Sequence, residues 1–188
     1  MRLCRKQSLN LKNLQMIAII GNGISGITAA RYIRKHSDVP ITIISEESTY
    51  FFSRTALMYV YMGHMKFEHT QPYEPHFWKK NNINLLQNRV ISVNTEEKTL
   101  KFQNEQEFKY SKLILATGSK PNKYGWKGEN AERVSGLYSK QDLETIEKYS
   151  EQLETAIIVG GGLIGIELAE MFLSRNINVH FLVREKFF

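Results

Sequence analysis

The sequence of 188 residues contains a single cysteine, Cys4, and this scarcity excludes several classes of chemistry. One thiol cannot form a disulfide within the chain, a cysteine-bound metal cluster or a redox-active dithiol. The five histidines show no close metal-ligand spacing, so we predict no metal site. No stretch approaches the ~18 continuous apolar residues of a transmembrane helix, and none resembles a secretory signal. We therefore expect a cytoplasmic protein without a membrane span.

Acidic residues are missing from the beginning of the chain, and this absence explains most of the formal net charge of +6. Residues 1–15 contain four basic residues and no acidic one. Removing these four from the 25 basic residues leaves 21 against 19 acidic residues, a charge of +2 for the body. A nearly neutral body predicts no nucleic-acid binding. We interpret residues 1–15 as a basic disordered tail, with a targeting segment as the alternative.

Glycine is concentrated in two places, because seven of the twelve glycines lie in two stretches with the same spacing. The first stretch consists of Gly21, Asn22, Gly23, Ile24, Ser25 and Gly26. The second, 139 residues later, contains Gly160, Gly162 and Gly165 at the same offsets. Each stretch follows an apolar run typical of a buried strand and precedes a pattern typical of a helix. The chain thus contains the same strand–turn–helix pattern twice.

Each glycine of this pattern has its own physical reason. The first permits a tight turn, the second leaves the main-chain amides open to a pyrophosphate, and the third lets the helix and strand pack closely. The helix N-terminus adds free N–H groups and a partial positive charge. Glu46 and Glu185 follow the next expected strand in the two copies, where a carboxylate can accept hydrogen bonds from a ribose. Two dinucleotide-binding sites are predicted.

The remaining pattern predicts an α/β fold. Strands are expected at 16–20, 41–44, 83–86, 112–121 and 179–183, and the strand ending in Ala-Thr-Gly is expected to be buried. Helices are expected at 27–36, 50–64, 72–82 and 141–152. Another helix has one apolar face formed by Ile164, Leu168, Met171 and Phe172. Alternation within 89–111 predicts a small antiparallel β meander. Arg54 is the one charge in the run 50–64, and such an arginine favours an anionic partner.

Three motifs together resemble the FAD-dependent pyridine nucleotide-disulfide oxidoreductase family. They are the two glycine stretches and "YSKLILATGSKP", while "FFSRTALMY" is similar to the family's YSR-x-x-L-S-K segment. Rubredoxin and ferredoxin reductases, and NADH-oxidase-like or nitrite-reductase-like members without redox cysteines, are the most similar. The resemblance implies that residues 16–122 are the first part of a Rossmann-like FAD-binding domain with the meander. Residues 123–188 are then the truncated start of a Rossmann-like NAD(P)-binding domain.

The resemblance also implies roles for individual residues. The FAD would be held by Gly21, Asn22, Gly23, Ile24, Ser25, Gly26 and Glu46, with Arg54 beside the flavin, Val90 near the adenine, and Thr117 and Gly118 near the phosphates. NADH or NADPH would be held by Gly160, Gly162, Gly165 and Glu185. Glu167 matches a family glutamate close to the flavin and nicotinamide, and its alternative interpretation is an exposed helix residue.

Two departures from the family shape these expectations. Tyr59 stands where the YSR segment often ends in a lysine that pairs with the glutamate, and the family's redox cysteines are absent. Family members also continue past the point where this sequence stops. We therefore expect a fragment, inactive alone, of a protein that forms a homodimer through its missing C-terminal region.

The predicted function is an FAD-dependent NAD(P)H oxidoreductase. Hydride would pass from NAD(P)H to FAD, and electrons would continue to a small redox protein, a nitrite-reductase centre, oxygen or a quinone. NADH is favoured because Glu185 suits a ribose 2′-hydroxyl and repels a 2′-phosphate, although Arg184 could serve that phosphate. The alternatives are a non-catalytic FAD- or NAD-binding redox sensor, or a nucleic-acid binder that uses the basic tail.

Overall fold

The computed structural model describes residues 15–184, which divide into two compact packing units. Unit 1 contains the described residues up to Thr49 together with Pro75–Thr117, and unit 2 contains Tyr50–Glu74 and the described residues from Gly118 on. The chain therefore passes between the units three times. These units are defined by packing and do not test the cofactor-binding domains predicted at 16–122 and 123–188, so the limits of those domains stay a prediction. The predicted tail, 1–15, lies outside the described residues except for Gln15.

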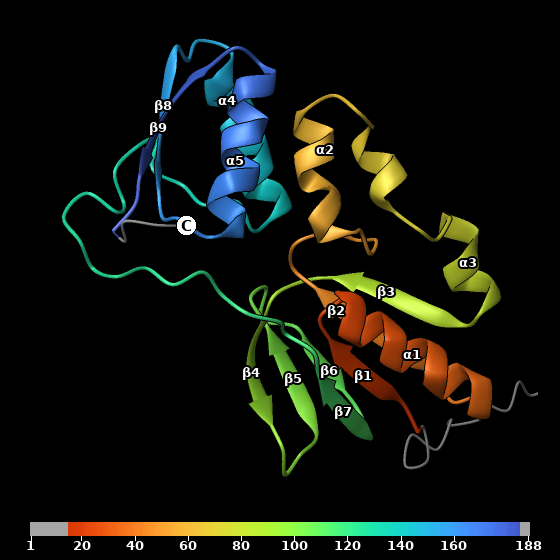
Figure 1. Ribbon diagram of the computed structural model, residues 1–188. Coiled ribbons are helices and arrows are strands. Elements are labelled where there is room, and N and C mark those ends of the chain that lie inside the picture. Colours follow the sequence, from red (N-terminus) through yellow and green to blue (C-terminus); the bar gives the residue numbers. More distant parts are fainter. Residues whose placement is uncertain (1–14, 185–188) are drawn as a thin grey trace, which may run out of the picture. The chain divides into compact units, whose positions relative to one another are not determined.

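Unit 1 is built on a four-stranded parallel sheet in the order β3-β2-β1-β7. The strands are β1 (Ile17–Ile20), β2 (Ile41–Ser45), β3 (Ile83–Gln87) and β7 (Lys112–Leu115). Their register aligns Ile17 with Ile41 on one side and Lys112 on the other. All four strands run in one direction, so their carboxyl ends lie at one edge of the sheet (Figure 1). The predicted Rossmann-like parallel sheet is confirmed.

The two faces of this sheet are covered differently. Helix α1 (Ile24–His36) follows β1 and buries Gly26, Ile27 and Ala30. The antiparallel meander of β4 (Val90–Asn94), β5 (Thr99–Phe102) and β6 (Glu107–Lys109) supplies a second core. In that core Leu100 and Phe102 pack with Ala18 of the sheet. Helix α3 (Pro75–Lys80) leads into β3. The predicted meander is confirmed.

Two predictions about unit 1 need correction. Helix α1 begins at Ile24 rather than at Ile27, because the last part of the glycine stretch already forms its first turn. The strand predicted at 112–121 ends at Leu115 and is not buried, since Leu115 is 66% exposed. β7 has a hydrogen-bonded neighbour on one side only, so an apolar strand pattern did not imply burial here.

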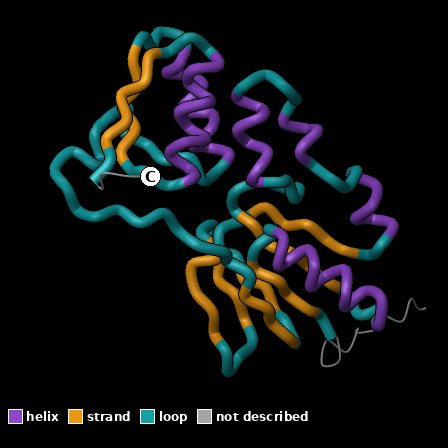
Figure 2. The backbone as a smooth tube through the Cα atoms, viewed as in Figure 1, coloured by secondary structure: helices purple, strands orange, loops and turns teal. Residues whose placement is uncertain are grey.

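Unit 2 contains a parallel pair of strands with helices on one face. The strands are β8 (Thr155–Val159) and β9 (Asn178–Leu182), joined through α5 (Leu163–Ser174) and preceded by α4 (Lys140–Ser150). The face toward α5 buries Ala156 and Ile158, whereas Ile157 on the other face is 65% exposed. The long loop before α4 is drawn in teal in Figure 2.

The segment 50–74 packs in unit 2. A 3₁₀ turn (Arg54–Ala56), α2 (Leu57–Tyr61) and a second 3₁₀ turn (Phe67–Thr70) replace the single helix predicted at 50–64. Tyr61 lies in a core with Met171 of α5 and residues of α4. The predicted apolar face of α5 is correct for Met171, Leu168 and Phe172 but wrong for Ile164, which is 60% exposed in the first turn.

No described helix is both long and apolar enough to cross a membrane. Within residues 15–184 no group of histidine, cysteine or acidic side chains is arranged to hold a metal ion.

Candidate dinucleotide sites

The two glycine stretches fold into the same backbone geometry. Gly21 and Gly160 open the turns with φ of +109° and +119°, values that favour glycine. The amide of Gly21 donates to the carbonyl of Ile44, and the amide of Gly160 donates to that of Leu182. Each turn therefore leaves its strand in a left-handed bend held by the neighbouring strand.

The third glycine of each stretch is required by close packing inside the turn. A Cβ at Gly26 would lie 2.0 Å from the carbonyl oxygen of Gly21. A Cβ at Gly165 would lie 2.3 Å from that of Gly160, and 3.1 Å from the ring of Phe181. No side chain fits at these distances, so both positions are glycine for reasons internal to the fold.

The middle glycine of each stretch has no such internal reason. Gly23 has φ −71° and ψ −177°, and Gly162 has φ −84° and ψ 176°, which any residue can adopt. Apart from the chain immediately around each glycine, the described residues place no heavy atom within 4 Å of a Cβ built at either position. Both positions face open space at a helix N-terminus. The absence of a side chain there is what a ligand lying close against the backbone requires.

The N-terminal caps of α1 and α5 differ from that of α4. Helix α4 begins with a complete capping box, in which Ser139 Oγ accepts from the amide of Asp142 and the Asp142 carboxylate accepts from the amide of Ser139. Helices α1 and α5 have Gly23 and Gly162 as their N-cap residues and therefore no side-chain cap. The amides of an uncapped first turn have no intrahelical partner and carry the positive end of the helix dipole. Both helices can therefore bind an anionic group.

The loop after β2 is fastened to the first glycine turn. Asn22 is buried, and its Nδ2 donates to the carbonyl oxygen of Ser48 at 2.8 Å and to the Ser48 hydroxyl at 3.3 Å. Glu46, on the same loop, forms an ion pair with Arg89, with 3.3 Å between Oε2 and Nε. Both of these charged side chains are more than half exposed, so water can reach the carboxylate. Asn22 thus acts within the protein, and it fixes the turn relative to Glu46.

Other residues predicted for the first site lie around the same sheet. Ile24 and Ser25 are exposed in the first turn of α1. Thr117 is exposed just beyond β7, next to Ala116, whose carbonyl oxygen would lie 2.1 Å from a Cβ at Gly21. Val90 begins the meander and packs at the edge of its core. The carboxyl edge of the unit 1 sheet thus gathers the glycine turn, Glu46 and Thr117.

Arg54 and Gly118 lie in unit 2. The guanidinium of Arg54 lies over the ring of Tyr138, with 4.3 Å to the centroid, and Nη1 donates to the Tyr138 carbonyl. The Tyr138 hydroxyl accepts from the amide of Ser119 at 3.3 Å. It would also lie 3.2 Å from a Cβ at Gly118, whose φ is +72°. Tyr138 therefore contacts two of the predicted flavin-binding segments.

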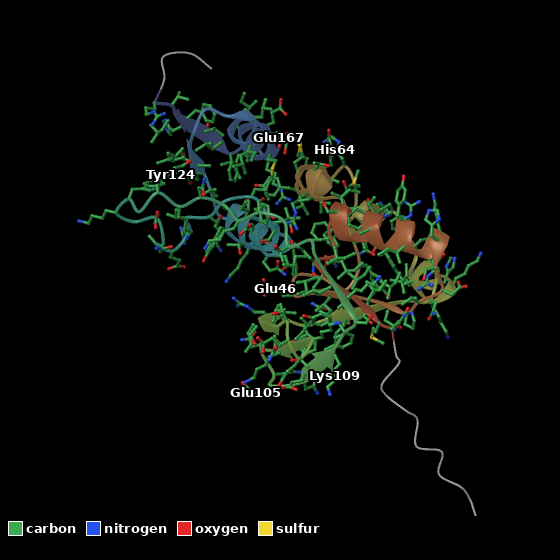
Figure 3. All side chains as sticks on the ribbon, turned by 90° about the horizontal axis from the view of Figure 1, so that it is seen from below. Glu46, His64, Glu105, Lys109, Tyr124 and Glu167 are labelled. Atoms are coloured by element: carbon green, nitrogen blue, oxygen red, sulfur yellow. The ribbon has the colours of Figure 1, made fainter. Side chains whose placement is uncertain are left out.

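Glu167 projects from α5 and is exposed (Figure 3). Within residues 15–184 its carboxylate has no ion pair or hydrogen bond. Tyr59 is 45% exposed, and its ring meets His64 edge-on at 6.1 Å. Glu185, predicted for the second site, lies outside the described residues, and the adjacent Arg184 is exposed.

A buried tyrosine joins the helices of unit 2. Tyr61 has no exposed surface, and its hydroxyl lies 2.6 Å from that of Ser150, which itself donates to the carbonyl of Ile146. The guanidinium of Arg175 lies 3.7 Å from the centroid of the Tyr61 ring and donates to the Tyr61 carbonyl. Burial is the main cause that raises the pKa of Tyr61 above 10.0. α2, the helix after Arg54, is thereby fixed to α4 and α5.

Several residues of these sites have no signal in the sequence. Tyr138 stands before the cap of α4 and belongs to none of the motifs that we identified. Ser48, Arg89 and Arg175 likewise become visible only through their contacts with Asn22, Glu46 and Tyr61. The capping box of α4 is the one local signal nearby, since Ser139 and Asp142 have the spacing of such a cap.

The parallel sheet, the repeated turn and the two uncapped helices are those of a protein class that binds dinucleotides at the carboxyl ends of its strands. The family model for pyridine nucleotide-disulphide oxidoreductases matches residues 15–188. The chain belongs to this family.

Known proteins agree with this assignment. The chain is 29% identical over 156 residues to a rubredoxin-NAD(+) reductase of Pseudomonas putida, covering 81% of this chain and 40% of that protein. It is 33% identical over 171 residues to an NADH oxidase of Methanocaldococcus jannaschii, covering 86% and 38%. The crystal structure of the NADH:rubredoxin oxidoreductase of Clostridium acetobutylicum has a TM-score of 0.81 and 27% identity, over 89% of this chain and 44% of the other. The chain spans about two fifths of these relatives. The homologues support FAD and NADH as the cofactors.

Proposed function

We propose that this chain is the cofactor-binding part of an FAD-dependent NADH oxidoreductase. One observation carries the proposal: Gly23 and Gly162 have ordinary backbone angles and no neighbour that a side chain would meet among the described residues. Glycine at both positions is explained if a pyrophosphate lies against the main-chain amides. Two such turns on one chain accommodate two dinucleotides.

We propose that FAD lies at the first turn and NADH at the second. Under this proposal the amides of Gly23, Ile24 and Ser25 face the FAD pyrophosphate, while Asn22 holds the turn to the loop that carries Glu46. The exposed Glu46 carboxylate can then accept from ribose hydroxyls. The remaining first-site residues are proposed as assigned above: Gly21, Gly26, Val90, Thr117 and Gly118, with Arg54 beside the flavin.

The second turn takes the nicotinamide cofactor. Gly160, Gly162 and Gly165 provide the same bend and the same uncapped helix for its pyrophosphate. Glu185 is proposed as the ribose ligand that favours NADH over NADPH. Glu167 is proposed to lie near the reacting rings, where an exposed carboxylate with no partner among residues 15–184 is available to a ligand.

When bound, NADH supplies a hydride and FAD accepts it, so the cofactors carry the chemistry. The protein contributes placement. The glycine turns fix the pyrophosphates, Glu46 fixes the ribose, and the guanidinium of Arg54 supplies positive charge on the flavin side. Residues 15–184 contain no cysteine, and under this proposal the two electrons pass to another acceptor.

We propose a small redox protein as that acceptor. Support comes from the relatives, because they include a rubredoxin-NAD(+) reductase, an NADH-rubredoxin oxidoreductase and a ferredoxin–NAD(+) reductase component. Oxygen, a quinone and a nitrite-reductase centre remain the competing acceptors, since NADH oxidases and nitrite reductases are also relatives. Each NADH supplies two electrons, so two molecules of a one-electron acceptor would each be reduced once.

Three further points belong to the proposal. A cytoplasmic location suits an enzyme that uses NADH. Homodimerisation is proposed through a region beyond residue 188. We also propose that residues 1–188 alone lose FAD during purification and are inactive, since they span about two fifths of their relatives.

A visible spectrum tests the proposal. The whole protein reconstituted with FAD is expected to be yellow, and NADH is expected to bleach it in the absence of oxygen. Addition of rubredoxin should then restore the colour. A protein that binds FAD and is not bleached by NADH or NADPH would instead be the non-catalytic redox sensor, and a colourless protein that takes up no FAD would refute the proposal.

A further inference from the structure

Tyr138 connects two parts of unit 2 that are far apart in the sequence. Its carbonyl accepts from Arg54, 84 residues earlier, and its ring lies under the guanidinium at 4.3 Å. Its hydroxyl accepts from the amide of Ser119 at 3.3 Å. Arg54 and Ser119 each lie just after a point where the chain enters unit 2, at Tyr50 and at Gly118. Tyr138 therefore links Arg54 and Ser119, two residues that each follow a point where the chain enters unit 2.

The main chain of Tyr138 is itself held in place. The carboxylate of Asp142 accepts from the amide of Tyr138 at 3.0 Å and from the amide of Ser139 at 2.8 Å. The same carboxylate completes the capping box of α4. Tyr138 thus immediately precedes the capped first turn of α4, and its carbonyl and ring present a fixed surface to Arg54.

The contact with Gly118 explains the glycine at that position. Gly118 has φ +72°, and a Cβ there would lie 3.2 Å from the Tyr138 hydroxyl. The left-handed backbone and the close approach of the phenol occur at the same residue. The phenol therefore fits the course of the chain at Gly118, the last residue of the Ala-Thr-Gly motif.

We propose that Tyr138 is a positioning residue of the flavin site. This inference rests on the function proposed above, because it assumes that Arg54 and the Thr117–Gly118 segment face the FAD. Tyr138 acts through them: its ring and carbonyl hold the guanidinium of Arg54 in one direction, and its hydroxyl holds the amide of Ser119. An arginine has many rotamers in water, so a fixed guanidinium binds an anion or flavin edge with less loss of entropy.

Two substitutions separate the two contacts. Tyr138→Phe keeps the ring beneath Arg54 and removes the acceptor for Ser119, so the dissociation constant for FAD should rise about two- to fivefold. Tyr138→Leu removes the ring as well, and the constant should rise about tenfold. Tyr124 is the matched control, since it is a tyrosine on the same long loop with 84% of its surface exposed (Figure 3). Tyr124→Phe and Tyr124→Leu should leave the constant unchanged.

A double-mutant cycle distinguishes positioning from general destabilisation. If Tyr138 acts through Arg54, Tyr138→Leu should weaken FAD binding about tenfold in the native background and only about two- to fivefold, the part due to the Ser119 contact, in an Arg54→Leu background. FAD is titrated into the full chain up to millimolar concentration by fluorescence, and thermal unfolding of each variant without FAD serves as the folding control. If Tyr138→Leu does not fold, Tyr138→Met, which also removes the aromatic ring beneath Arg54, is used in the same cycle.

The outcomes separate the inference from the proposed function. If the native chain binds FAD and the Tyr138 variants bind it equally well, the inference is overturned and the function stands. Equal loss in both backgrounds would also overturn it, because it would show that Tyr138 only stabilises the fold. If the whole native protein binds no FAD, the proposed function fails and the inference fails with it.

Discussion

The carbonyl oxygen of Gly21 lies where the side chain of residue 26 would have to begin, since a Cβ at Gly26 would come within 2.0 Å of it. Gly160 and Gly165 repeat the relationship at 2.3 Å. In both turns the first and third glycines are required by the fold, whereas the middle glycine is explained by a ligand that lies against the backbone. This division allows predictions in which stability and binding change separately.

Gly26→Ala and Gly165→Ala should each destabilise the unit that contains them. Alanine normally favours a helix, but here its Cβ meets a main-chain oxygen that cannot move without breaking the turn, and we expect a loss of ~1–3 kcal/mol. Urea unfolding measures this directly. Gly136→Ala is the control, because Gly136 has no positive φ and no neighbour within 4 Å in the described chain. Unchanged stability of both helix variants would show that the turns are looser than described.

Asn22→Asp should loosen the first turn. The substitution replaces the Nδ2 donor with a carboxylate oxygen facing the Ser48 carbonyl, so a buried acceptor loses its partner beside a new charge. We expect a loss of ~1–3 kcal/mol in stability and weaker FAD binding, because the loop of Glu46 is no longer fastened. Asn104→Asp, on an exposed turn, is the matched substitution and should change neither quantity. Equal effects at both sites would contradict the role of Asn22.

Arg175→Lys should destabilise the packing of α2. Arginine donates from two nitrogens to the Tyr61 carbonyl while lying flat on the Tyr61 ring, and lysine cannot do both. The expected loss is ~1–3 kcal/mol by chemical unfolding. Arg133→Lys tests a second arginine over a tyrosine ring, that of Tyr149 at 5.5 Å on the surface, and should have little effect. If Arg175→Lys is as stable as the native protein, the contact between Arg175 and Tyr61 contributes no stability.

Tyr61 should make stability sensitive to high pH. Its pKa is raised above 10.0 in the folded state by burial, so the folded protein keeps this proton at pH values where the unfolded chain has lost it. The stabilisation is complete below the unfolded pKa and is lost as pH rises through the folded pKa. Unfolding free energy measured at about pH 8 and about pH 11 should fall more steeply for the native protein than for Tyr61→Phe. If the unfolding free energy of both proteins depends on pH in the same way, the loss of stability at high pH comes from other titrating groups.

The sequence predicted most of the elements of unit 1 because their signals are local. Apolar runs and glycine spacing located β1, β2 and β3, and the alternation in 89–111 located the meander. The start of α1 was misplaced because a glycine-rich first turn has no helix propensity to reveal it. The exposure of Leu115 could not be predicted, since a strand's burial depends on its neighbours in the sheet and not on its own composition.

The parts of the candidate site that a sequence motif defines were predictable. The parts that contacts between distant residues define were not. The paired glycine turns were evident from spacing alone. The contacts of Arg54 with Tyr138 were not, because the ring and carbonyl that it meets lie 84 residues away in the sequence. The link between Arg175 and Tyr61 spans 114 residues, and no local pattern encodes such a pair. Long-range polar contacts of this kind require the fold to be known first.

The most direct test of the central claim is a crossed titration of Gly23→Ala and Gly162→Ala with FAD and NADH in the full chain. Both variants should unfold like the native protein, because neither new methyl group meets a neighbour in the described structure. Gly23→Ala should lose FAD binding by about tenfold or more while keeping NADH, and Gly162→Ala should lose NADH while keeping FAD. If either variant binds both cofactors as the native chain does, its turn does not hold a pyrophosphate and the account of that site is wrong.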